Sequence, residues 1–224
     1  MLGVAREKAR VEGVGVDGEE VVRFLEGDVG ALEGLEGLEL GNGEGEEEEE
    51  EEEKFDVITI CSALVLLDRP GEAMKGWVER WLKRGGRLVC DVPCPRAMLG
   101  IKTLARVGKM VGVETLGDWE WVEGAESLRK MMEGAGLDAR VIETEAWEEV
   151  PSRTKFLGRM GEEGVWGVEE GGDVFDDLTR GREKWRERRE EARGLFEVEW
   201  RGMGGEDGLV REVNGLFVGI GVKR

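Results

Sequence analysis

The chain contains no histidine, tyrosine or glutamine, and it has only four prolines and three cysteines among its 224 residues. Without histidine, Ser-His and Cys-His nucleophile systems are excluded and the commonest zinc ligand is missing. No apolar run approaches the ~20 residues of a membrane-spanning helix. The first residues also lack the basic and apolar regions of a secretory signal. We therefore expect a cytoplasmic protein with no membrane partner.

The three cysteines, Cys61, Cys90 and Cys94, fall in or beside predicted strands. In an intracellular protein, such positions favour reduced and buried thiols. Neither histidine nor a second cysteine pair accompanies Cys90 and Cys94 in the sequence, so we predict that they hold no metal.

Acidic residues give the chain a net charge of −19. Nine of the acidic residues are glutamates that lie between residues 41 and 53. A block of like charge this dense is typical of a solvated, disordered loop, an interpretation that we favour over a segment that recruits a partner. The rest of the chain is also acidic. Because nucleic acid phosphates repel an acidic protein, we expect no nucleic acid partner.

Residues 55–92 have the pattern of a strand, an amphipathic helix, a Gly-Gly turn and a second strand. The apolar run 57–61 is typical of a strand that is covered on both faces in a parallel sheet. Asp68 can cap the helix and Gly85 can end it in the left-handed conformation, before the strand at 87–92. The apolar stripe of the helix consists of Met74, Trp77, Val78, Trp81 and Leu82. This order predicts a parallel crossover and an α/β fold.

Weaker patterns lie on both sides of this unit. The further predicted elements are a strand at 21–25, helices at 98–111, 127–133 and 173–193, and strands at 138–144 and 215–222. For the last strand, a tight hairpin with residues 209–213 as its first arm stays an alternative. We expect one domain over 1–224, with 41–53 as the acidic loop and 145–208 as a helical lid. The residues expected to seal this lid onto the core are Trp185, Phe196 and Trp200.

Four segments resemble, in order, consecutive parts of class I S-adenosylmethionine-dependent methyltransferases. MLGVAREKARVEG looks like the helix after their second strand, and VRFLEGDVGAL is similar to their third-strand segment. FDVITICSALVLL resembles the fourth strand and its turn, and LKRGGRLVCDV is like the Leu-x-x-Gly-Gly-x-Leu motif that enters the fifth strand. The resemblance covers about the first hundred residues. It implies a Rossmann-like methyltransferase sheet, truncated at its N-terminus, with a helical insertion before the last strand.

The resemblance also implies a set of residues that bind S-adenosylmethionine. Asp28 would accept a hydrogen bond from the adenine amino group, and Val29 would donate its backbone N–H beside it. Cys61, Ser62 and Ala63 would edge the methionine part, mostly through backbone groups. On the alternative interpretation, Asp28 caps the following helix and the three small residues only form a tight turn.

Substrate contacts are implied at three further positions. Asp91 lies at the carboxyl end of the fifth strand, where open α/β sheets place ligands, and it could orient a substrate hydroxyl or amine. Trp119 and Trp121 lie in the loop where this family builds substrate pockets. If that loop is extended, one indole is buried and the other exposed. Capping by Asp91 and core packing by both tryptophans are the structural alternatives.

A complete family member begins with a strand that leads into a Gly-x-Gly-x-Gly loop, followed by an acidic residue that grips the ribose. This sequence shows neither a predicted strand with such a loop nor that acidic residue. Gly13, Gly15 and Gly18 have a similar spacing, but they follow a predicted helix and precede a strand, which is the wrong context. We therefore expect weak cofactor binding. The resemblance implies methyl transfer from S-adenosylmethionine to a small molecule, and the alternative is a truncated, non-catalytic remnant or binding module.

Overall fold

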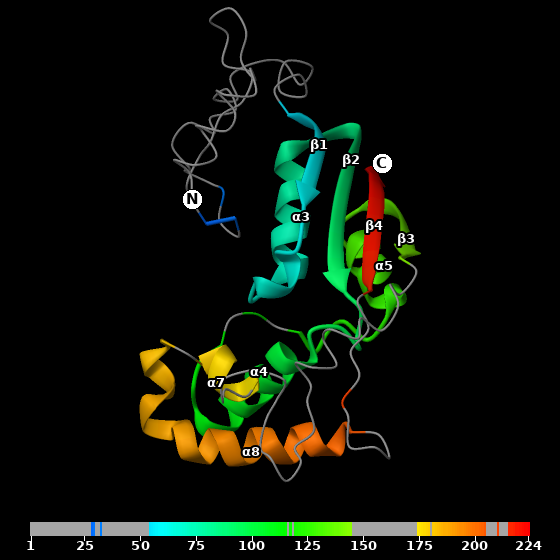
Figure 1. Ribbon diagram of the computed structural model, residues 1–224. Helices are drawn as coiled ribbons and strands as arrows, with labels where there is room; N and C mark the ends of the chain where they lie inside the picture. Colours follow the sequence, from blue (N-terminus) through cyan, green and yellow to red (C-terminus); the bar gives the residue numbers. More distant parts are fainter. Residues whose placement is uncertain are drawn as a thin grey trace, which may run out of the picture.

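The computed structural model describes residues 28–29, 32, 54–115, 117, 119–144, 174–179, 181–204, 210 and 215–224. Its elements, in chain order, are β1 (Phe55–Ile60), η1 (Leu64–Leu66), α3 (Pro70–Trp81), β2 (Leu82–Pro93), α4 (Leu99–Val111), α5 (Ala125–Gly134), β3 (Leu137–Glu143), α7 (Val174–Thr179), η2 (Glu183–Arg188), α8 (Arg189–Gly202) and β4 (Leu216–Lys223) (Figure 1). The predicted strand at 21–25 and the acidic loop at 41–53 lie outside the described residues.

The four strands form one sheet in the order β1-β2-β4-β3. Strands β1 and β2 are parallel, with Ile60 opposite Cys90, and α3 connects them. Strand β4 runs antiparallel to both of its neighbours, so that Gly219 faces Cys90 on one side and Val141 on the other. The predicted parallel unit and the α/β fold are therefore confirmed, and the last strand occupies the interior of the sheet.

The core lies on the face of the sheet that α3 and α5 cover, behind the strands in Figure 1. The predicted stripe of α3 is buried there against Ile60 and Leu88, together with Leu128 and Met132 of α5. Glycine in β4 allows the close approach of α5, because a Cβ added at Gly219 would lie 2.5 Å from the Met132 sulfur. Helix α5 is thus seated directly on the β4 backbone.

The opposite face of the sheet is not covered by either of these two helices. The strand register aligns one row of side chains across this face, namely Thr59, Val89, Ile220 and Arg140. Val57, on the same side of β1, is 53% exposed. The prediction that the strand at 57–61 is covered on both faces is therefore wrong for the described part of the chain. The reason is that α3 and α5, the helices that pack on the sheet, share one side of it.

The ends of α3 differ from the prediction. Pro70 opens the helix as its first residue, but the N-cap residue is Arg69, and no side chain caps the helix. Asp68 is therefore not the cap. The helix ends at Trp81, and Gly85, although left-handed with a φ of 72°, lies inside β2. Strand β2 begins as soon as the helix ends.

A second cluster of buried side chains joins α4 to α7, η2 and α8, beyond the carboxyl ends of β1 and β2 in Figure 1. Its aromatic members are Phe175, Trp185, Phe196 and Trp200. The predicted helix at 173–193 is in fact three elements, because Gly181, with a φ of 70°, interrupts it, and α8 then continues to Gly202. The prediction that these aromatic residues pack on the core of the sheet is therefore wrong, because they pack on α4.

Within the described ranges, none of the helices combines the length and the apolar composition that crossing a membrane requires.

Candidate functional site

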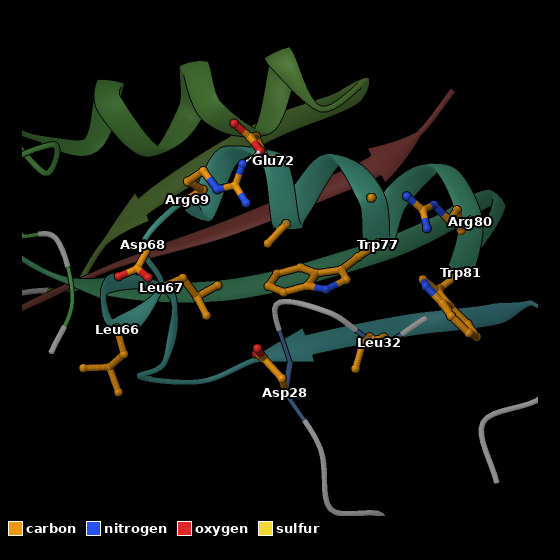
Figure 2. A pocket seen from close by; sticks show the side chains of 12 residues that line it. Asp28, Leu32, Leu66, Leu67, Asp68, Arg69, Glu72, Trp77, Arg80 and Trp81 are labelled. Carbon is orange, nitrogen blue, oxygen red and sulfur yellow. Dashed lines mark ion pairs between the residues drawn. The ribbon is translucent and has the colours of Figure 1, made fainter. Parts of the chain in front are cut away.

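A cavity of about 410 Å³, called the first cavity below, lies beside α3 (Figure 2). Its apolar lining consists of Leu32, Leu66, Leu67, Ala73, Gly76, Trp77 and Trp81. Its charged lining consists of Asp28, Asp68, Arg69, Glu72 and Arg80. Figure 2 shows Asp28 and Leu32 on one side of the cavity and the α3 side chains on the other. Apolar and charged side chains therefore line the first cavity together.

Trp77 fixes the position of Asp28 at this cavity. The Trp77 side chain is 3% exposed and packs in the core. Its Nε1 donates a hydrogen bond to the Val29 carbonyl oxygen at 2.9 Å, across 48 residues of sequence. Because Val29, the next residue along the chain, is held in this way, the Asp28 backbone is kept beside the cavity that its side chain lines. The sequence pattern predicts Trp77 as a core residue, but it carries no signal for this hydrogen bond.

Charge in the first cavity is mixed. Arg69 and Glu72 form an ion pair at 2.8 Å with both side chains largely in solvent, so the pair contributes little to stability. Asp28 and Asp68 add two carboxylates to the lining. Carboxylate oxygens accept hydrogen bonds from amino and hydroxyl groups, while the leucine and tryptophan walls suit a flat ring. The arrangement can hold a polar heterocycle whose donors face the carboxylates.

A second group of predicted residues meets at the carboxyl ends of β1 and β2. The backbone N–H of Ser62 donates to Oδ1 of Asp91 at 2.5 Å. Ser62 is left-handed with a φ of 54°, an uncommon conformation for a residue other than glycine, and this bond helps to hold it. The Ala63 carbonyl accepts from the Leu66 N–H at 2.9 Å, so Ala63 opens the short helix η1. Through η1, the chain passes from this edge of the sheet to the wall of the first cavity.

The cysteines near this edge differ in exposure. Cys90 and Cys94 are buried free thiols, as predicted, whereas Cys61 is exposed, which corrects the expectation for that residue. Cys61 is exposed because it follows the last residue of β1. Burial raises the pKa of the Cys90 thiol to about 12, and the nearby Asp91 carboxylate adds to the shift. Cys90 is therefore a neutral core residue near neutral pH. In the described part of the chain, no group of three or more cysteine, aspartate or glutamate side chains could hold a metal ion.

The two tryptophans predicted at a substrate pocket both pack against the core of the sheet. Trp119 is buried and Trp121 is partly buried, so the alternation expected of an extended loop does not apply. The cause is that the backbone turns at Glu120 and Trp121 and is not extended. The Trp121 Nε1 is buried without a hydrogen-bond partner among the described residues. Trp119 lines a separate cavity of about 240 Å³, called the second cavity below.

The predicted site residues thus divide among three places. Asp28 lines the first cavity, and Val29 is held beside it by Trp77. The second place is the carboxyl edge of the sheet, which gathers Cys61, Ser62, Ala63 and Asp91. The third is the core near the second cavity, where Trp119 and Trp121 lie. Leu66 and Leu67 belong to the resembling segment 55–67, and their place in the turn after its strand was the available signal that they line a cavity.

No protein-family model and no curated protein matches the chain. Among solved structures, the YcgJ protein from Bacillus subtilis is similar to it at 15% identity, over 100% of this chain and 78% of that one, with a TM-score of 0.51. A putative methyltransferase from Bacillus halodurans is 17% identical over 97% and 77%, with a TM-score of 0.42. A SAM-dependent methyltransferase from Archaeoglobus fulgidus is 15% identical over 76% and 60%, with a TM-score of 0.36. At such identities the likeness concerns the fold alone.

Proposed function

From the class I methyltransferase fold of the chain and the first cavity beside α3, we propose a function in S-adenosylmethionine-dependent methyl transfer to a small molecule. The first cavity receives the adenosyl part of the cofactor. The hydrogen bond from Trp77 to Val29 carries this proposal, because it holds Asp28 where it can accept from an adenine amino group.

The residues present fit this part of the cofactor. The volume of about 410 Å³ lies within the ~300–1,000 Å³ of ordinary small-molecule sites. Leu66, Leu67 and Trp77 supply apolar walls for the adenine ring. The carboxylate of Asp68 can accept hydrogen bonds from the ribose hydroxyls, a role for which the sequence pattern indicates no residue.

When bound, S-adenosylmethionine supplies a methyl group on a sulfonium sulfur. Its in-line transfer depends on positioning and on the exclusion of water, and needs no protein nucleophile. The absence of histidine is therefore compatible with this chemistry. Asp91 keeps its Oδ2 for a further hydrogen bond, since Oδ1 is engaged by Ser62. In our proposal, Oδ2 orients the hydroxyl or amine of the acceptor.

The second candidate function is a binding module without catalysis. The observation that favours it is that no Gly-x-Gly-x-Gly run in the sequence follows a predicted strand, because the backbone of such a strand-loop approaches the amino-acid end of the cofactor in the family. The two candidates differ in turnover: a binding module retains the adenosyl contact and transfers no methyl group.

The test of the adenosyl site compares S-adenosylhomocysteine with its inosine analogue by saturation-transfer NMR, which detects weak binding. We expect a signal from the adenine compound only, because Asp28 accepts from an amino group and repels the inosine carbonyl. Asp28→Asn should remove this preference, whereas Asp138→Asn, at an exposed position on β3, should retain it. Equal signals from the two ligands, or an unchanged preference in Asp28→Asn, would refute the proposed site. Methyl transfer to a panel of acceptors then separates the enzyme from the binding module.

A further inference from the structure

The second cavity lies against the wall of the first. Its lining consists of Pro95, Lys102, Ala105, Arg106, Lys109, Gly117, Trp119, Glu120 and Val122. Gly117 has a φ of 84°, and a Cβ added there would lie 2.1 Å from the Val65 carbonyl oxygen and 3.0 Å from the Leu66 Cα. Leu66 lines the first cavity, so this backbone contact is part of the wall between the two. A ligand in the second cavity would therefore sit next to the proposed adenosyl site.

The lining of the second cavity is basic, although the chain as a whole has a net charge of −19. Helix α4 supplies Lys102, Arg106 and Lys109, whose spacing of four and three residues places them on one face of the helix. Among the described residues of the lining, Glu120 is the one carboxylate. Such a group of cations in an acidic protein concentrates positive potential where an anion can reach it.

Two of these cations form ion pairs that a ligand can replace. Arg106 pairs with Glu199 at 3.3 Å, with exposed fractions of 46% and 35%, and Lys109 pairs with Glu120 at 3.0 Å, with 57% and 62%. Pairs this exposed contribute little to stability, so the exchange of a protein carboxylate for a ligand carboxylate costs little. Lys102 has a different role.

The Lys102 ammonium donates to the Cys94 carbonyl oxygen at 2.8 Å and to the Pro95 carbonyl oxygen at 3.1 Å. Both oxygens belong to the segment that follows β2, and Asp91 lies near the end of that strand. Lys102 therefore fixes the floor of the second cavity in relation to the carboxyl edge of the sheet, and Arg106 and Lys109 are left to bind the ligand anion.

The rest of the lining selects the body of the ligand. Ala105, Trp119 and Val122 supply the apolar part of the lining. The volume of about 240 Å³ is below the ~300–1,000 Å³ of drug-sized sites, which limits the ligand to a small molecule. We propose that the second cavity binds a small organic carboxylate with an aromatic or aliphatic body, held at its carboxylate by Arg106 and Lys109. That such an acid is also the methyl acceptor rests on the proposed function.

The test is calorimetric titration of the full chain with benzoate at low ionic strength, with benzamide as the neutral comparison. We expect benzoate to bind about tenfold more tightly, a difference of ~1.4 kcal/mol, because its carboxylate accepts charge-assisted hydrogen bonds from two cations and the neutral amide does not. Arg106→Gln together with Lys109→Gln should remove that advantage, and Arg106→Lys with Lys109→Arg should restore part of it. Lys75→Gln is the matched control, because it removes an exposed pair with Glu79 on α3, outside the cavity.

Equal affinities for benzoate and benzamide would overturn the proposal, as would an equal loss of benzoate binding in Lys75→Gln. Thermal unfolding followed by circular dichroism identifies a variant that has lost its fold, and in that case the restoring pair decides the outcome. The titration contains no cofactor. Benzoate binding without any S-adenosylhomocysteine signal would therefore support the carboxylate site and refute the proposed function, and the reverse result would refute the carboxylate site alone.

Discussion

The backbone N–H of Ser62 donates to Oδ1 of Asp91 at 2.5 Å and so joins the carboxyl ends of the parallel strands β1 and β2. The bond holds Ser62 in the left-handed region, where the chain leaves β1 and turns into η1. Asp91 thus has a structural role in this edge of the sheet in addition to the acceptor contact that we propose. The two roles make different predictions for its variants.

Asp91→Ala should lower the free energy of unfolding by ~0.5–1.5 kcal/mol, because the Ser62 N–H loses its acceptor. Asp91→Asn retains an oxygen at the same place and should stay within ~0.5 kcal/mol of the parent chain. Urea unfolding measures both values. If the two variants are equally destabilised, the negative charge of Asp91, and not its position as an acceptor, supports the turn.

Trp77→Phe should be less stable than Trp81→Phe by ~1 kcal/mol. Both changes replace a buried indole on α3 with a smaller ring, but only Trp77 donates a hydrogen bond to Val29. The difference between the variants therefore isolates this bond, and guanidinium unfolding measures it. Trp77→Phe should also weaken the S-adenosylhomocysteine signal, because Asp28 is no longer held at the cavity. A larger loss of stability in Trp81→Phe would contradict this account.

Gly117→Ala should be far more destabilising than Gly112→Ala. Both glycines are left-handed, with φ values of 84° and 71°, and each alanine pays the conformational cost of ~1 kcal/mol. At Gly112 the added Cβ meets nothing within 4 Å, whereas at Gly117 it would lie 2.1 Å from the Val65 carbonyl oxygen. Relief of that clash would separate the loop from η1, at an additional ~1–3 kcal/mol. Equal melting temperatures for the two variants would show that the loop does not pack there.

The stability of the chain should fall at alkaline pH through Cys90. Its thiol has a pKa raised by burial from 9.0 to about 12, so above pH 9.0 the unfolded chain has lost a proton that the native chain retains. The free energy of unfolding then decreases by up to ~1.4 kcal/mol per pH unit within this window. Urea unfolding between about pH 8 and about pH 10.5 measures the slope.

Cys90→Ala is the control for this dependence. The variant lacks the thiol, so its slope should be smaller by the Cys90 contribution, although its stability at pH 8 is lower because of the lost side-chain volume. All other ionisable side chains are common to both proteins, so they do not affect the difference. If the free energy of unfolding falls equally steeply with pH in the parent chain and in Cys90→Ala, the raised pKa of Cys90 is contradicted.

The sequence alone predicted the elements whose pattern is local. The apolar run of β1 and the stripe on α3 are periodic features, and each element forms where its pattern lies. The helix at 98–111 and the strand at 138–144 were likewise predicted to within a residue or two of α4 and β3. The prediction failed where packing between elements decides the outcome. Gly181 divides the predicted helix at 173–193, and its aromatic residues then pack on α4.

The sequence by itself determined the α/β class, the parallel crossover and the candidate residues Asp28 and Asp91. Only the tertiary structure decided what these residues face. It brings Trp77 to Val29 across 48 residues, Ser62 to Asp91 across 29, and Gly117 against Val65. Each of these contacts joins two segments that are remote in the chain, so it forms only when the fold places the two segments side by side. Periodicity reports only which face of an element is apolar, so it carries no information about such pairs.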